Sequence, residues 1–597
     1  MVENRNDEFR QFEIALKTIM RGNISDYNDL IYILSYLCLI DSKLGNNPYN
    51  SFENEFINNS KNTLESFVDA VERRFKSYTT NRYALNVKKA IEYLNEFRFS
   101  NVDSKELIDL LKTKDLYFYE KALISNAYGK GNINYPIRNE DTPIELVDLF
   151  KYFALGNKYL DVGCGNGNVL VGLSYMKRKF VKCDGIEINP RNVFISNLRL
   201  SLCNNVSSKI ILEDYLTSHL NQKYSFITIN MPFNLHIPSM KRNEINVINH
   251  NSKFDWVFSP ATSSEWIYIN KAINLLDDNG RIVLVTPQTP LFKTGDMKFR
   301  KDLVDNNLIE YVIDMPAGTY PNTMGSYSLV VLNNNKKDDV IRFVNASECY
   351  VQQRMGRKVD SSKIIEILDN ESYKEISNSE VAANEYKLLA NRFIDLENKP
   401  KLRNAVQLCE LNIDITRGFQ IFSRSDVVEN GKYSIVTITD IDDNGNVSSD
   451  LGKFNTDKDV EKYILNKNDI LVTTRGTRIK TCLIDNLENK NTIYQGNLTL
   501  IRVKDERLDP IYLKLYLDSE RGQLELKTIQ TGTTIISINT SELSKIEIPL
   551  ISIEEQKKIV DEYLFKKSEI DILSNRLNEL KNNIADSINQ VFEGVKE

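Results

Sequence analysis

Hydrophobic positions change their spacing along the chain and divide it into segments. Before about residue 115 they recur every three or four positions, as in FRQFEIALKTIM and NVKKAIEYLNEFRF, which predicts helices. From about 120 to 335 short apolar runs alternate with helical segments: KYLDVG, CDGIEI, KIILED, FITINM, RIVLVTP, IEYVID and SYSLVVLN. This alternation predicts an α/β fold, a mostly parallel Rossmann-like sheet with helices on both faces.

The second half of the chain follows other patterns. An irregular stretch through NNNKKDD leads to predicted helical segments that end near EYKLLANRF, and IDLENKPKLRN is typical of a linker. From 405 to about 553, YSIVTITDI, DILVTT, TCLID and LTLIRV are separated by Asn, Asp and Gly turns, which predicts a β-rich domain. We therefore predict four domains, at residues 1–118, 119–395, 401–553 and 554–597.

The last predicted domain is one long helix. Ser552 and Glu555, three residues apart, are expected to cap its start. Apolar residues then recur at alternating steps of three and four, which is a coiled-coil seam and predicts a partner helix in this chain or another. The seam residues are Ile570, Leu573, Leu577, Leu580, Ile584 and Val591, with Ser587 at one seam position.

Composition adds only a little to this prediction of the fold and the domains. The 597 residues are 41% hydrophobic and 26% charged, as in an ordinary soluble protein of several domains. No apolar run approaches the ~20 residues that span a bilayer, the N-terminus lacks a signal-peptide core, and seven dispersed cysteines suit a reducing cytoplasm. We expect a cytoplasmic protein with no membrane partner and no metal site. A net charge of −6 does not mark a nucleic-acid binder, yet an acidic protein can carry a locally basic cleft.

Candidate cofactor chemistry begins at KYLDVGCGNGNVLVGL, a predicted strand, glycine turn and helix. Gly163, Gly165 and Gly167 let the backbone approach a ligand closely. Glu187 and Asp214 stand at the ends of the next two strands. Glu187 can accept hydrogen bonds from both ribose hydroxyls, and Asp214 can accept one from an adenine amino group. These strand ends, with the DxGxGxG spacing that starts at Asp161, indicate S-adenosylmethionine rather than NAD. Each acid has an alternative role as a strand-end or helix-cap carboxylate.

A second motif, Asn230-Met231-Pro232-Phe233, ends the strand YSFITI on the same expected edge of the sheet. One interpretation is a packed turn with the Phe folded onto the core. The other is amine chemistry, because the Asn230 side-chain carbonyl and the Met231 main-chain carbonyl can accept both hydrogens of an adenine N6 amine and free its lone pair. Phe233 can stack on a base that has left its helix. Positioning and electrostatics then suffice for direct methyl transfer.

These motifs and their order resemble the gamma class of N6-adenine DNA methyltransferases. NINYPIRNEDTPIELVDLF resembles the family segment in which a Thr-Pro pair, here Thr142-Pro143, helps cover the cofactor. Residues 1 to about 395 are similar to the modification subunit of type I restriction–modification systems. Met231 stands where the family usually has Pro. Since a main-chain carbonyl makes the contact there, we expect activity to be kept.

Residues 401 to 597 resemble one half of a type I specificity subunit, a target-recognition domain followed by a spacer helix. The resemblance implies double-stranded DNA as a partner. Arg475, Arg478 and Lys480 are suited to phosphates or a guanine edge, the alternative being a solvated loop. Family specificity subunits carry two such halves, so a homodimer through the closing helix is expected to restore a two-part site. A separate restriction or translocase subunit is a further implied partner.

The leading interpretation is a sequence-specific DNA adenine-N6 methyltransferase that carries its own recognition domain. N4-cytosine methylation is an alternative, although that chemistry usually shows Ser at the first tetrapeptide position. Protein-glutamine methyltransferases share Asn-Pro-Pro-Tyr but lack a recognition domain. A different class is a DNA-binding assembly subunit that recruits a separate restriction enzyme. A nuclease in the first 115 residues is not expected, because no Glu-x-Lys occurs there.

Overall fold

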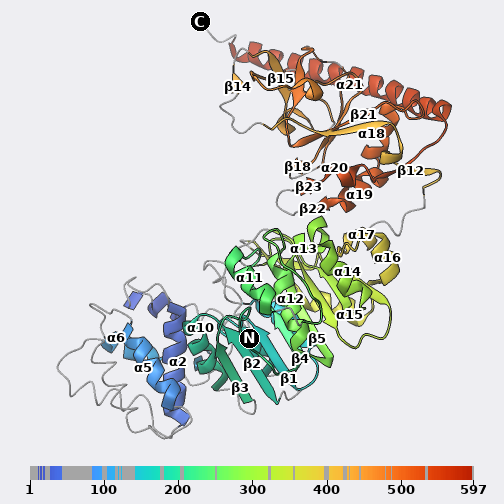
Figure 1. Ribbon diagram of the computed structural model, residues 1–597. Coiled ribbons are helices and arrows are strands. Elements are labelled where there is room, and N and C mark those ends of the chain that lie inside the picture. The colour runs from blue at the N-terminus through green and yellow to red at the C-terminus, as the bar shows by residue number, and fades with distance from the viewer. Residues whose placement is uncertain are drawn as a thin grey trace. The chain divides into compact units, whose positions relative to one another are not determined.

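We describe the protein from a computed structural model (Figure 1). The chain forms two compact units, Met1–Ala390 and Asn391–Glu597, and each is described by itself. The division into four domains stays a prediction. The structure describes the following residues: parts of 11–19, then 27–43, 84–96, 104–113, 118–119, 123, 142–174, 181–201, 207–248, 252–320, 325–353, 356–394 and 402–593, the last without 421–426, 429–430, 443–444, 449, 477–478, 486, 488 and 532–535.

A nine-stranded sheet is the centre of the first unit, in the order β11-β8-β6-β7-β5-β4-β1-β2-β3. The pairs from β3 to β5 are parallel, β7 runs antiparallel to both β5 and β6, and β11 runs antiparallel to β8. The seven predicted strands and the mostly parallel sheet are therefore confirmed. The strands are β1 (Lys158–Val162), β2 (Lys182–Glu187), β3 (Ser207–Leu212), β4 (Tyr224–Ile229), β5 (Leu276–Pro287), β6 (Ile309–Asp314), β7 (Tyr327–Asn333), β8 (Val340–Asn345) and β11 (Lys374–Ser377).

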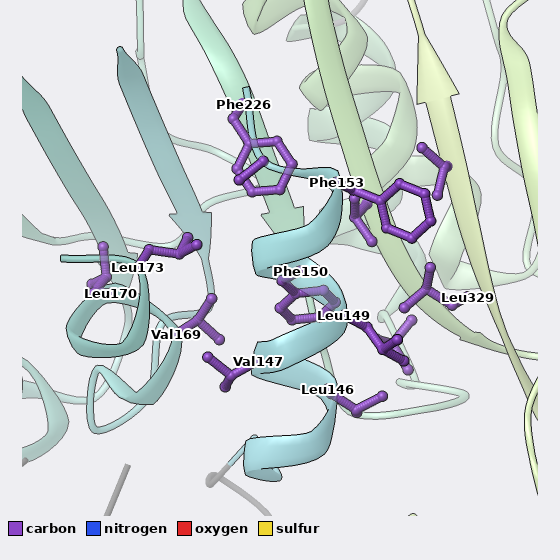
Figure 2. Close-up of a cluster of buried hydrophobic side chains, with 14 of the residues drawn as sticks. Leu146, Val147, Leu149, Phe150, Phe153, Val169, Leu170, Leu173, Phe226 and Leu329 are labelled. Carbon is purple, nitrogen blue, oxygen red and sulfur yellow. The ribbon is translucent and has the colours of Figure 1, made fainter. Parts of the chain in front are cut away.

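Helices cover both faces of this sheet, as predicted. On one face, α8 (Ile144–Phe153) inserts Phe150 and Phe153 into a core that also holds Phe226 of β4 and Leu329 of β7 (Figure 2). On the other face, Leu284 of β5 lies with side chains of α12 and α14 around a small enclosed cavity. The remaining helices that matter below are α9 (Asn168–Ser174), α10 (Pro190–Ser201), α11 (Ser239–Ile248), α12 (Ser264–Leu275), α14 (Met297–Asp305) and α15 (Ser361–Asp369).

The described N-terminal residues are helical, as predicted, in α2 (Tyr27–Lys43), α5 (Ala84–Glu96) and α6 (Ser104–Lys112). They pack against α10 of the sheet domain, where the ring of Tyr93 stacks on Phe194 with centroids 4.4 Å apart. Buried Arg199 of α10 donates to the main-chain oxygens of Leu123, at 2.9 Å, and of Asn166, at 2.5 Å. Because Asn166 belongs to the glycine turn, this arginine ties the helical segment to the cofactor loop.

The prediction for residues 334 to 377 is partly wrong. It gave an irregular stretch followed by helices, whereas the chain adds β8 and β11 to the main sheet, and β9 (Tyr350–Gln352) and β10 (Arg357–Val359) form a separate pair. The segment VIRFVN buries Ile341 and Phe343 at a spacing of two, which is a strand pattern. The helices described in this part of the chain are α15, α16 (Asn378–Ala383) and α17 (Asn391–Ile394).

The second unit is β-rich, as predicted, with sheets β13-β21-β17-β19, β14-β16-β15-β20 and β18-β23-β22 and the pair β12-β24. Two helices that were not predicted, α18 (Pro510–Asp518) and α19 (Glu520–Thr528), pack within it. Its strands include β15 (Tyr433–Val436), β17 (Ile470–Thr473), β18 (Arg475–Gly476), β19 (Thr481–Leu483) and β21 (Leu498–Val503).

The long closing helix is confirmed as α21 (Ile553–Glu593). Its predicted cap is also confirmed, because the Ser552 hydroxyl accepts from the Glu555 main-chain N–H at 3.3 Å and the Ser552 N–H donates to the Glu555 carboxylate at 3.2 Å. Among the helices described here, none combines the length and apolar character that crossing a membrane requires.

Candidate active site

The glycine turn, residues 163–167, follows β1 at the carboxyl edge of the sheet. Gly163, Gly165 and Gly167 have φ values of 67°, 52° and 78°, which only glycine adopts without strain. The N–H of Gly163 donates to the Ile186 carbonyl of β2 at 2.9 Å. A Cβ added at Gly163 would overlap the Sδ atom of Met231. The turn therefore packs directly against the tetrapeptide, residues 230–233.

Glu187, at the end of β2, fastens this turn. Its Oε2 accepts from the Gly165 N–H at 2.9 Å, and its Oε1 accepts from the Asn189 N–H at 2.8 Å. Glu187 therefore acts as a strand-end cap, which is the alternative role given for it above. Each carboxylate oxygen has a further lone pair, so contact with ribose hydroxyls remains compatible with these bonds.

Asp161 of β1 lies beneath the turn and is 2% exposed. Its Oδ1 accepts from the Thr228 hydroxyl at 2.7 Å, while its buried Oδ2 has no hydrogen-bond partner among the residues described. Burial raises the pKa of Asp161 to about 7, with Glu187 adding to the rise and the hydrogen bond from Thr228 opposing it. A buried acceptor without a partner indicates room for a donor that the chain itself does not supply.

Asp214 follows β3 and has partners on both oxygens. Its Oδ1 accepts from the Leu216 N–H at 3.0 Å, and its Oδ2 pairs with the ammonium group of Lys241 on α11. An adenine amino group would share this carboxylate with Lys241. Its role in cofactor binding stays a prediction.

Asn230 lies directly after β4, and its amide is held on both sides. The Oδ1 atom accepts from the Tyr320 hydroxyl at 2.7 Å, and the Nδ2 atom donates to the Thr142 hydroxyl at 2.8 Å. The main-chain oxygen of Thr142 accepts from Asn168 of α9 at 3.2 Å, and Pro143 precedes the first turn of α8. The structure thus brings the Thr-Pro segment to Asn230, a contact that the sequence analysis did not anticipate.

The rest of the tetrapeptide is supported by two residues that sequence reasoning missed. The Phe233 ring stacks on Tyr320, with centroids 4.5 Å apart and planes at 20°. After Pro232 and Phe233, the Asn234 N–H donates to buried Glu265 of α12 at 3.1 Å. For Tyr320 a signal was available, since it lies between the predicted strands IEYVID and SYSLVVLN and hence near the sheet edge.

The three recognition candidates lie in the second unit. Arg475 is exposed on β18, and Lys480 donates to the main-chain oxygen of Ile441 at 2.8 Å. Arg478 lies outside the described residues. Contact of these side chains with DNA stays a prediction.

A Rossmann-like sheet with a glycine turn after its first strand and an amide-bearing turn after its fourth is the fold of a methyltransferase domain. Two protein-family models match the chain. The model described as N-6 DNA Methylase matches residues 142–401, and the model described as Type I restriction modification DNA specificity domain matches residues 406–582. The two models match successive parts of one polypeptide.

Its relatives among characterised proteins are methylase subunits. The chain is 22% identical over 325 residues to the Type I restriction enzyme MpnII methylase subunit of Mycoplasma pneumoniae, covering 49% of this chain and 59% of the relative. It is 23% identical over 380 residues to the Type I restriction enzyme MjaVII methylase subunit of Methanocaldococcus jannaschii, covering 56% and 64%. The chain therefore spans less than two thirds of the length of these relatives.

Two solved structures are similar to parts of this chain. The type I restriction-modification system methyltransferase subunit from Streptococcus thermophilus is 16% identical with a TM-score of 0.48, covering 65% of this chain and 99% of that chain. The type IIG restriction endonuclease BpuSI is 13% identical with a TM-score of 0.43, covering 92% and 74%.

Proposed function

We propose that this chain is a sequence-specific DNA methyltransferase. It transfers a methyl group from S-adenosylmethionine to the N6 amine of an adenine extruded from double-stranded DNA, as the modification and specificity component of a restriction–modification system. One observation carries this proposal. Strands β1 and β4 are parallel neighbours, so the glycine turn and the tetrapeptide meet at one edge, with Gly163 against Met231.

The roles of the tetrapeptide follow from its position. Asn230 Oδ1 and the Met231 main-chain oxygen accept the two N6 hydrogens and localise the nitrogen lone pair, and Phe233 stacks on the base. Thr142 holds the Asn230 amide so that its oxygen faces the base. Bound S-adenosylmethionine supplies an electrophilic methyl group. The N6 nitrogen gains that methyl group as the bond between the methyl carbon and sulfur breaks, which leaves S-adenosylhomocysteine, and the amine releases one proton to water.

S-adenosylmethionine suits the residues around the glycine turn. The unpartnered Oδ2 of Asp161 can accept from its ammonium group, Glu187 from its ribose hydroxyls, and Asp214 from its adenine amino group. The three glycines have no side chains that would keep a ligand from the backbone, and Thr142-Pro143, just before α8, would help to cover the cofactor.

Cofactor binding is expected to depend on the charge of Asp161. With a pKa of about 7, Asp161 is mostly a carboxylate at pH 8 and mostly neutral at pH 6. The carboxylate fraction falls about tenfold over this range, so the affinity ratio between the wild type and Asp161→Asn should fall by a similar factor. Calorimetric titration with S-adenosylmethionine at both pH values measures this ratio, in which the cofactor's own titration cancels. A constant ratio would contradict a charged role for Asp161.

Product analysis tests the proposed reaction. Purified protein is incubated with S-adenosylmethionine and unmethylated DNA, the DNA is digested, and the methylated nucleoside is identified. We expect N6-methyladenine, and sequencing that detects this base then gives the recognition site. N4-methylcytosine would mean that the base pocket accepts cytosine. No methylation together with tight DNA binding would favour an assembly subunit that recruits a separate restriction enzyme.

The specificity domain supports DNA binding by the second unit, with Arg475, Arg478 and Lys480 as the proposed contacts. The seam of α21 supports pairing with a second copy of the chain. Its residues are far more exposed than apolar side chains in a folded core. The exposed fractions are 61% for Ile570, 69% for Leu573, 52% for Leu577, 45% for Leu580 and 61% for Ile584, while the side chains of Ser587 and Val591 lie outside the described residues.

Leu573→Glu is expected to separate the dimer, because a carboxylate on the seam faces an apolar partner helix. Light scattering should then give about half of the wild-type mass. Ile572→Glu is the matched control, since Ile572 is 67% exposed on the same helix but off the seam, and it should remain dimeric. A wild type that is monomeric both free and on DNA would contradict the dimer.

A further inference from the structure

Tyr320 lies where two parts of the proposed base site meet. It follows β6 and precedes β7, and its hydroxyl donates to Asn230 Oδ1 at 2.7 Å. Its ring stacks on Phe233 at 4.5 Å and lies 5.1 Å from the ring of Tyr327. One side chain therefore contacts two of the three groups that the proposed mechanism assigns to the target adenine.

These contacts are those expected of an adenine base. The phenol supplies a flat aromatic face to Phe233 and an O–H donor to Asn230, as adenine would supply its ring and an N6–H donor. Burial raises the pKa of Tyr320 to about 12, so the hydroxyl stays protonated and donates at neutral pH. The stacking contact excludes a base from the same face of Phe233.

We propose that Tyr320 occupies the target-base site in the DNA-free protein and that an extrahelical adenine must displace it. This inference rests on the proposed adenine chemistry and adds a competing side chain to that site. Tyr320 is then a positioning residue. It holds the side chains of Asn230 and Phe233 in place, and it raises the free energy that any base needs to enter the target-base site.

Contacts that do not involve the Tyr320 side chain hold the groups next to it. The hydroxyl of the preceding Thr319 donates to the Pro316 main-chain oxygen at 2.6 Å and lies 2.9 Å from the Tyr327 hydroxyl. These bonds anchor the backbone just before Tyr320. Because the Thr142 contact holds Asn230 independently, rotation of Tyr320 leaves the amide oriented for the incoming base.

Free adenine tests the occupancy without DNA or catalysis. With the cofactor site saturated by S-adenosylhomocysteine, we expect Tyr320→Ala to bind adenine at least about tenfold more tightly than the wild type, as judged by equilibrium dialysis. Purine, which lacks the amino group, should bind Tyr320→Ala more weakly than adenine does, and Asn230→Ala in the same background should remove that preference. Tyr350→Ala, a tyrosine outside the site, is the matched control. Equal adenine binding by the wild type and Tyr320→Ala would overturn the proposal.

Tyr320→Phe provides a second test that does not depend on the alanine variant folding. It keeps the ring but loses the hydrogen bond to Asn230, so the affinity for DNA that carries the recognition site should rise about two- to tenfold. Unchanged or weaker DNA binding would overturn the inference. The two proposals fail separately, since adenine can fill the cavity of Tyr320→Ala in a protein that methylates no DNA.

Discussion

Asn230→Ala is expected to abolish methyl transfer while DNA binding and cofactor binding persist. The substitution removes the side-chain oxygen that accepts an N6 hydrogen, an interaction that gains strength as the nitrogen lone pair attacks. Loss of one such preorganised group costs about 10²–10³ in kcat. Single-turnover transfer of labelled methyl groups to DNA measures the chemical step, and gel-shift titration measures binding.

Two variants make this result specific. Asn335→Ala removes an exposed amide from the turn after β7 and should leave the rate unchanged. Asn230→Asp keeps an acceptor but lacks the N–H that donates to Thr142, so it should retain more activity than Asn230→Ala. A rate for Asn230→Ala within a few-fold of the wild type would exclude the proposed chemistry. Loss of DNA binding in that variant would instead assign Asn230 a structural role.

The sheet was predictable because its signal is local. Each of the seven predicted strands, from β1 to β7, is a short apolar run between polar turns, and hydrophobic spacing reports such runs directly. β8 and β11 were missed because charged residues interrupt them. Arg342 of β8 forms an ion pair with Glu375 of the neighbouring strand β11 at 3.1 Å. Because these two residues are far apart in sequence, hydrophobic spacing within either segment does not reveal the contact.

The site was predictable where its residues lie inside a motif. Asp161 lies near the end of β1, and the three glycines and Asn230 follow β1 and β4. Parallel strands bring these ends to one edge. Tyr320, Glu265 and Lys241 were missed because they reach the site from distant segments. Tyr320 and Asn230 are 90 residues apart in sequence. They come together because β4, β5, β7 and β6 are neighbours in this order in the sheet.

Gly163→Ala is expected to impair cofactor binding and catalysis together. At a φ of 67° an alanine costs about 1–2 kcal/mol in backbone strain. Its Cβ would also overlap Met231 Sδ and displace the residue whose main-chain oxygen faces the N6 amine. A misplacement of ~1 Å at a reacting group can cost 10²-fold in rate, so kcat should fall about a hundredfold. Gly356→Ala, at a φ of 95° with no atom within 4 Å of the added Cβ, is the matched control and should keep both functions.

A double variant separates the steric effect from the backbone strain. Met231→Ala removes the sulfur that the new Cβ would meet while it keeps the main-chain oxygen, so this substitution alone should change kcat only slightly. In the Gly163→Ala/Met231→Ala protein the overlap is relieved and only the strain remains. We expect kcat to recover at least about tenfold over Gly163→Ala, which makes the two substitutions strongly non-additive. Additive losses would show that Gly163 and Met231 act independently, and the proposed meeting of the methyl donor and the amine at this contact would then be wrong.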